Sequence, residues 1–121
     1  MQVERVDFVS VPTQDIERSK RFYGETLGLP HERDTPIGAE FLAGQVTLGI
    51  WDPTKVGREF AANPTELALR VPDVAAARTE LEGKGVEFAG ETFDTGVCHM
   101  AFFDDPDGNA LMLHRRYAPH E

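Results

Sequence analysis

The sequence predicts an α+β fold of two consecutive βαβββ modules, each a curved mixed sheet with one main helix. Three observations favour it. Segments with the apolar alternation of strands surround one helical segment in each half of the chain. The first half's pattern returns in the second, because Asp15 and Asp73 each follow a strand and a proline, and Gly28 and Gly85 each follow a helix. Finally, Asp105-Pro106-Asp107-Gly108-Asn109 joins two apolar runs, as in a β-hairpin.

The first module opens with a strand. Residues 3–11 alternate loosely and are rich in valine, and a proline ends the run. Thr13 or Asp15 then caps a helix expected over about residues 15–26, with Gly28 in the left-handed position after its last turn. Further strands are expected at 29–33, 39–43 and 45–51, separated by turns at 34–38 and Gly44.

The stretch between the two repeats has no clean periodicity and includes two prolines, so it is interpreted as a linker. The predicted organisation is one domain, 1–121, with a first module at 1–52, the linker at 53–64 and a second module at 65–118. The second module's expected elements are a strand at 66–71, a helix from Asp73 to about Gly83, a strand at 86–89, a loop at 90–96 and strands at 97–103 and 110–117.

Charge and cysteine content exclude several classes of function. The formal net charge of −9 disfavours nucleic acid and anionic membrane as partners, although it permits a cationic ligand. A single cysteine, Cys98, allows no internal disulfide and no thiolate metal cluster, and a small buried apolar role is expected for it. No apolar run approaches the length of a bilayer span, so the predicted location is cytoplasmic.

Taken together, three motifs resemble the vicinal oxygen chelate superfamily, which includes glyoxalase I, extradiol dioxygenases and bleomycin-resistance proteins. These motifs are Asp15-Ile16-Glu17-Arg18-Ser19-Lys20-Arg21-Phe22-Tyr23 with Leu27-Gly28-Leu29, Val71-Pro72-Asp73-Val74, and Phe103-Asp104-Asp105-Pro106-Asp107-Gly108-Asn109. The resemblance covers nearly the whole chain. It implies the glyoxalase/bleomycin-resistance fold, in which modules curl around a cavity, and a homodimer.

The resemblance also implies four metal-ligand positions, on the first and last strand of each module. In this sequence they are Phe8, Gly49, Glu66 and Met112. Only Glu66 suits a hard divalent ion, because a thioether is a poor ligand for such metals. We therefore expect no family metal site and no cofactor; a divalent metal at a relocated site with Glu66, His99 and His114 is the alternative.

Strand alternation, anchored on those positions, predicts which side chains face the cavity. The candidate ligand-binding residues are Phe8, Ser10, Gly49, Trp51, Glu66, Arg70, Met112 and His114. Phe8 and Trp51 would stack on a planar ligand and Glu66 would pair with a cation. Alternatively, Phe8 and Met112 fill the cavity as core, and Glu66 and Arg70 form a structural ion pair.

These residues lead to three functional hypotheses. The preferred one is a metal-free protein of the bleomycin-resistance type that binds a drug or metabolite and so gives antibiotic resistance. The second is a lyase, isomerase or dioxygenase-like enzyme of the same superfamily, using a relocated metal or acid–base chemistry by Glu66 and His114, with no catalytic residue assigned. The third is a structural module whose cavity is filled by its own side chains.

Overall fold

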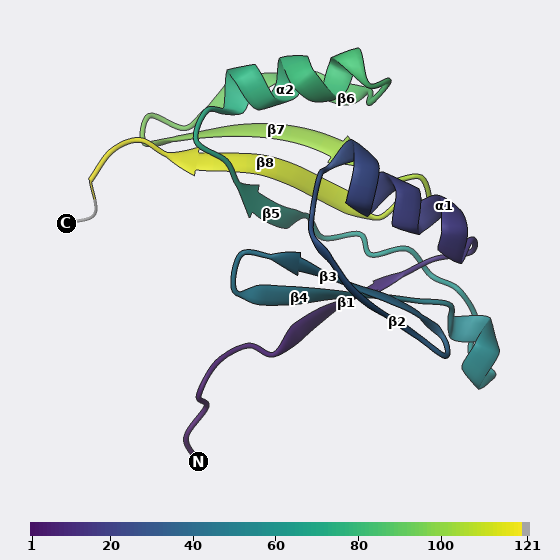
Figure 1. Cartoon of the computed structure of the whole chain (residues 1–121). Helices are drawn as coiled ribbons and strands as arrows, with labels where there is room; N and C mark the ends of the chain where they lie inside the picture. The colour runs from purple at the N-terminus through teal and green to yellow at the C-terminus, as the bar shows by residue number, and fades with distance from the viewer. Residues whose placement is uncertain (120–121) are drawn as a thin grey trace. The chain divides into compact units, whose positions relative to one another are not determined.

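The fold was examined in a computed structural model that describes residues 1–119 (Figure 1). The chain forms two compact units, Met1–Asn63 and a second that begins at Pro64. Each unit is a four-stranded mixed sheet with one main helix, in the order βαβββ. The predicted fold class is therefore confirmed. No helix in the described range is both long and apolar enough to cross a membrane.

The first unit orders its strands β1-β4-β3-β2, with β1 parallel to β4 and the other pairs antiparallel. Its elements are β1 (Phe8–Pro12), α1 (Ile16–Arg21), a π-helical turn (Phe22–Thr26), β2 (His31–Thr35), β3 (Gly38–Ala43), β4 (Val46–Trp51) and a short 3-10 helix (Pro53–Val56).

Local chemistry explains where the first helix begins and ends. The Asp15 carboxylate accepts a hydrogen bond from the Arg18 amide at 3.0 Å, which satisfies a donor that the first turn leaves unpaired. Gly28 takes a φ of 74°, where a residue with a Cβ is strained. The helical segment buries Phe22 and Tyr23, and Tyr23 lies near the Phe41 ring of β3, with ring centroids 6.4 Å apart.

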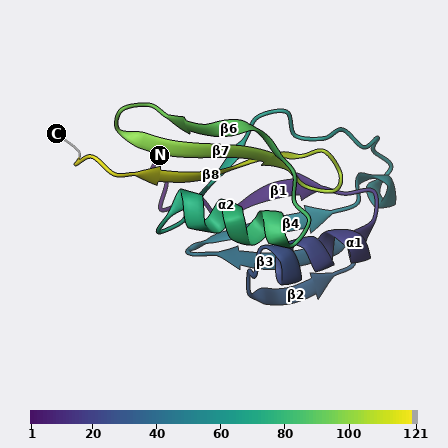
Figure 2. The same cartoon turned by 90° about the horizontal axis from the view of Figure 1, so that it is seen from above.

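The second unit repeats this topology in the order β5-β8-β7-β6, with β5 parallel to β8. Its elements are β5 (Leu67–Arg70), α2 (Val74–Gly83), β6 (Phe88–Asp94), β7 (Cys98–Asp104) and β8 (Ala110–Arg116), and Figure 2 shows β6, β7 and β8 side by side. Asp73 caps α2 through the amide of Ala76 at 3.0 Å, as Asp15 caps α1. The repeat between the two units therefore includes the aspartates that cap their main helices.

The hairpin turn between β7 and β8 is organised by one buried carboxylate. Asp105, only 5% exposed, accepts hydrogen bonds at Oδ1 from the amides of Asp107 and Asn109, both at 2.9 Å. Its Oδ2 accepts from Asn109 Nδ2 at 2.8 Å, and Gly108 takes a φ of 86°. A buried carboxylate needs such partners, and this turn supplies them from its own backbone and from the Asn109 side chain.

Two strand predictions need correction. The first strand begins at Phe8 rather than at residue 3, because the preceding segment forms no ladder and leaves Val3 and Val6 exposed. The predicted loop at 90–96 is largely strand, since β6 runs to Asp94. A bulge between Ala89 and Phe93 interrupts its pairing with β7, and this irregularity, together with Gly90, hid the strand in the sequence.

Candidate functional site

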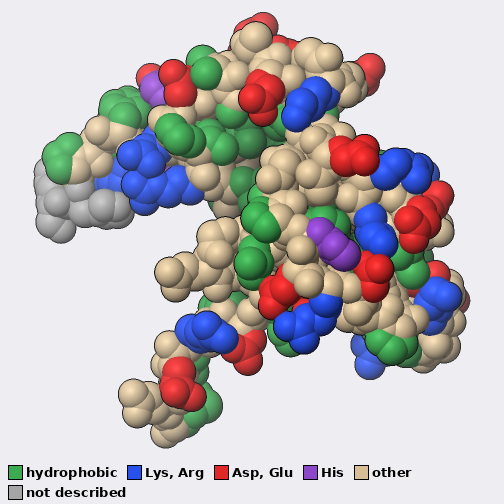
Figure 3. All heavy atoms as spheres, viewed as in Figure 1, with side chains coloured by type: hydrophobic (Ala, Val, Ile, Leu, Met, Phe, Trp, Pro, Cys, Tyr) green, Lys and Arg blue, Asp and Glu red, His purple; other side chains and the backbone are tan. Residues whose placement is uncertain are grey.

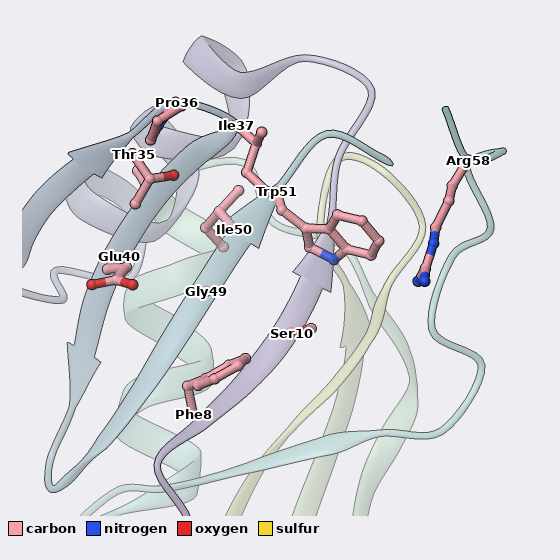
Figure 4. Close-up of a pocket in the computed structure, with 11 residues that line it drawn as sticks. Phe8, Ser10, Thr35, Pro36, Ile37, Glu40, Gly49, Ile50, Trp51 and Arg58 are labelled. Carbon is pink, nitrogen blue, oxygen red and sulfur yellow. The ribbon is translucent and has the colours of Figure 1, made fainter. Parts of the chain in front are cut away.

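The first unit contains a pocket of about 550 Å³ built on its sheet (Figure 4). Strand register explains which side chains meet there. Ser10 of β1 is the Cα partner of Gly49 on β4, and Gly49 is in turn the partner of Glu40 on β3. These residues form one row across three strands and share a face. Phe8 and Trp51 lie two positions along their strands, so alternation places them on the same face.

Four predicted site residues, Phe8, Ser10, Gly49 and Trp51, therefore line one pocket. The remaining lining residues were not predicted. They are Thr35, Pro36, Ile37, Ala39, Glu40, Ile50 and Arg58. The lining is thus mainly apolar and aromatic with a few polar groups, a composition typical of small-molecule pockets.

Glycine at position 49 leaves room above the sheet. A Cβ at this position would lie 3.7 Å from Phe8 Cδ2 and 3.8 Å from the Val9 carbonyl oxygen, which are ordinary contact distances. The site therefore has space for a side chain that the sequence does not supply. Gly38 is the opposite case, because a Cβ there would lie 1.8 Å from the Ile50 carbonyl oxygen. Gly38 is needed for strand pairing, whereas Gly49 opens the pocket.

The two aromatic side chains of the pocket are not fixed by hydrogen bonds to described residues. Phe8 is 61% exposed, so it does not fill the core of its own unit. Trp51 is half-buried, and its indole Nε1 finds no hydrogen-bond partner within residues 1–119. No polar contact therefore fixes the rotation of the indole ring. Both rings offer apolar surface to the pocket.

The predicted linker contributes one residue, Arg58, to the lining of this pocket. Asp52 accepts hydrogen bonds from the Thr54 amide at 3.0 Å and from its hydroxyl at 2.7 Å, and the hydroxyl bond lowers the pKa of the Asp52 carboxyl. These bonds cap the 3-10 helix, which ends at Gly57 with a φ of 76°. The next amide, that of Arg58, donates to the Pro53 carbonyl at 3.0 Å. These backbone contacts thus fix the position of the Arg58 Cα atom, from which the side chain extends.

The two charged side chains at the pocket differ in their pairing. The Glu40 carboxylate lies 3.1 Å from Arg33 Nε on β2, and the same guanidinium lies 3.0 Å from the Glu32 carboxylate, so Glu40 has a partner that it shares with a second acid. The side chain of Arg58 forms no ion pair or hydrogen bond with any described residue, and it is exposed. On the face drawn in Figure 3, acidic and basic side chains are mixed, so the net charge is not gathered in one visible patch.

The other four predicted site residues lie on the second unit. Arg70 is the partner of His114 across β5 and β8, and Ala68 is the partner of Met112, so these side chains share one face of the second sheet. Arg70 and the preceding Glu66 are exposed, while Met112 and His114 are half-buried. Across the described chain, no ion pair joins Glu66 to Arg70. None of the four lines the pocket, and their role in binding stays a prediction.

The residues at the implied metal positions do not fit a divalent ion. Phe8 and Gly49 offer no side-chain donor, and the Met112 thioether is too soft for Mg²⁺ or Mn²⁺. His99 of β7 instead lies 3.4 Å from Asp94, next to the Tyr117 ring. Between residues 1 and 119, no three His, Cys, Asp or Glu side chains gather as a metal site would require. We therefore derive no chemistry that uses a metal.

Two exposed polar clusters, one in each unit, contribute no residue to the pocket lining. Asp34 accepts from Lys20 and His31, both at 2.9 Å, and the Lys20 bond is the main reason that the pKa of Asp34 is lowered. In the second unit, the Gly96 amide and then the Tyr117 hydroxyl, each 2.8 Å from Asp94, lower the pKa of the Asp94 carboxyl. Both clusters join separate segments, so we assign them structural roles.

Comparison with known proteins gives the context of this site. The family described as Glyoxalase/Bleomycin resistance protein/Dioxygenase superfamily matches residues 5–113. TnmS3, an antibiotic binding protein from Streptomyces sp. CB03234, has a similar structure with a TM-score of 0.80 and 30% identity over 96% of this chain and 98% of its own.

A glyoxalase/bleomycin resistance protein from the same Streptomyces strain has a TM-score of 0.73 and 28% identity, over 92% of this chain and 100% of its own. YetH of Bacillus subtilis is 23% identical over an alignment of 117 residues, which covers 92% of this chain and 98% of YetH.

Proposed function

Because this chain belongs to the glyoxalase/bleomycin resistance protein/dioxygenase superfamily, we propose that it binds a small organic molecule, a drug or a metabolite, without the divalent ion of the superfamily's enzymes. The binding site is the pocket of the first unit. The observation behind this proposal is that Phe8 and Gly49 occupy positions where a metal-binding enzyme needs donors, and together with Trp51 they make an open aromatic pocket.

The relatives support a binding function. TnmS3, which shares 30% identity with this chain, is described as an antibiotic binding protein. A binding protein needs complementary surface rather than reactive groups, and the pocket provides two aromatic rings and an empty space above Gly49. An antibiotic-like molecule with a flat apolar body is the ligand class that this lining fits.

The proposal includes a homodimer, which the family resemblance implies. β1 and β5 are outer strands of their sheets, and Val3 and Val6 are exposed just before β1. Exposed apolar side chains beside an outer strand favour contact with a second copy. Sedimentation velocity at micromolar concentration tests this part, and a monomer at all concentrations would contradict it.

Binding can be followed through the single tryptophan. Because the chain has one tryptophan and it lines the pocket, its indole N–H resonance reports occupancy without assignment of the spectrum. The probe is 2-naphthylmethanol, a flat and neutral molecule. We expect a saturable shift of this resonance, and about fivefold weaker binding in Phe8→Ala, because one aromatic contact contributes roughly 1 kcal/mol.

The matched control is Phe93→Ala. Phe93 is 56% exposed, close to the 61% of Phe8, but it lies on β6 of the second unit and does not line the pocket. The control should bind the probe as the wild type does. A linear, unsaturable shift in the wild type, or equal losses in both variants, would refute the pocket as the site.

A further inference from the structure

We propose that the natural ligand has an acidic group, a carboxylate or an acidic phenol, which Arg58 binds while the flat body of the ligand lies against Phe8 and Trp51. This inference rests on the proposed function and specifies the class of molecule for the same pocket. It differs from the expectation drawn from composition, in which the net charge of −9 permits a cationic ligand.

The pairing of charges in the pocket determines which ligand charge is accommodated. A cationic ligand would need a free carboxylate, but the carboxylate of Glu40 already lies 3.1 Å from Nε of Arg33, whose guanidinium also lies 3.0 Å from Glu32 Oε1. Binding a cation there would compete with this ion pair. Arg58, the other charged lining residue, has no side-chain partner in residues 1–119, so an anion would gain a contact without breaking one.

The place of Arg58 is set by the backbone rather than by side-chain contacts. The Asp52 cap and the left-handed Gly57 end the 3-10 helix directly before Arg58, whose amide is bonded to Pro53. At the other end of this segment, Asn63 Nδ2 donates to the Ser10 carbonyl at 3.0 Å, which ties the segment to β1. The guanidinium is thus presented at the pocket while its five donors remain available.

The aromatic residues define the rest of the ligand. Figure 4 shows the Trp51 indole between Arg58 on one side and Glu40 on the other, with Phe8 further along the sheet. A flat ring system in contact with the indole would extend toward Arg58 on one side and toward Glu40 on the other, and only Arg58 is without a partner among the described residues. The screening length at physiological salt is about 8 Å, so this local contact outweighs the distant charges of an acidic surface.

Three probes with the same ring system test the charge preference. They are the 2-naphthyl compounds naphthoate, naphthylmethanol and naphthylmethylammonium. Each is titrated into the full chain while the indole N–H resonance of the tryptophan is followed. We expect naphthoate to bind about fivefold more tightly than the alcohol, the gain of one partly exposed ion pair, and the ammonium to bind no more tightly than the alcohol.

Variants separate the contact from the overall charge. Arg58→Gln should reduce the ratio of the naphthoate affinity to the alcohol affinity to about one. Lys55→Gln removes the same charge three residues earlier, from the 3-10 helix outside the pocket lining, and should keep the advantage of naphthoate. If the alcohol binds and naphthoate binds no better, the inference is wrong and the proposed function stands. If no probe binds, both are wrong.

Discussion

Filling the space above Gly49 is the most direct test of the pocket. In Gly49→Leu, the new Cβ would lie 3.7 Å from Phe8 Cδ2 and 3.8 Å from the Val9 carbonyl, so the backbone need not move. The rest of the leucine side chain would project from the shared face into the volume that a ligand needs. The variant should therefore fold normally and bind poorly.

The size of the effect follows from the geometry. Replacing a strand glycine removes a destabilising residue, so the free energy of unfolding should stay the same or rise by roughly 0.5–1 kcal/mol. Forcing a ligand past an added side chain costs about 1–3 kcal/mol, which corresponds to about 5- to 150-fold in Kd.

Two measurements complete the test. Urea denaturation gives the stability, and titration of naphthylmethanol against the indole resonance gives the affinity. Weaker binding accompanied by an equal loss of stability would point to a distorted sheet rather than a filled pocket. A stable variant that binds within twofold of the wild type would refute the assignment of the site.

Three further outcomes are expected. Gly38→Ala should lose about 3 kcal/mol in urea denaturation, because its Cβ would lie 1.8 Å from the Ile50 carbonyl oxygen; a neutral result would contradict the strand geometry. Asp105→Ala should lose about 3 kcal/mol, since buried donors of the turn are left unpaired, and Asp104→Ala on the exposed side is its control. Because the pKa of Asp94 is lowered, its carboxylate stabilises the fold at pH values above the ordinary pKa of aspartate. This stabilisation is lost as pH falls through the lowered pKa. Wild-type melting temperature should thus drop more steeply than that of Asp94→Asn between about pH 5 and pH 3, and parallel curves would exclude this role.

Much of the fold was predictable because its signals are local. Asp15 and Asp73 bond to the first turns of their helices as the sequence indicates, and the Asp105 turn forms where turn-favouring residues cluster. The part of β6 after Ala89 was missed because its pairing is non-local and interrupted by a bulge, so its stability comes from β7 rather than from its own alternation.

The candidate site was predictable where strand alternation, anchored on the ligand positions that the family resemblance implies, determines it. Phe8, Ser10, Gly49 and Trp51 share a face by parity on two parallel strands. Glu40 could also have been found, because the tight turn at Gly44 and Gln45 sets the β3–β4 register and places Glu40 opposite Gly49. Arg58 had no such signal. Its position depends on a 3-10 helix cap and a backbone hydrogen bond in a stretch without periodicity.

The mixed topology of the first sheet has a kinetic consequence for the pocket. β2, β3 and β4 are joined by short turns and can pair early, whereas the parallel pairing of β1 with β4 must close a long loop that includes the helix. We therefore expect Phe8 and Ser10 to take their places after β2, β3 and β4 have paired. Hydrogen exchange of the backbone amides should be faster in β1 than in β4. A ligand bound in the pocket should slow the exchange in β1, because it stabilises the docked position of this strand.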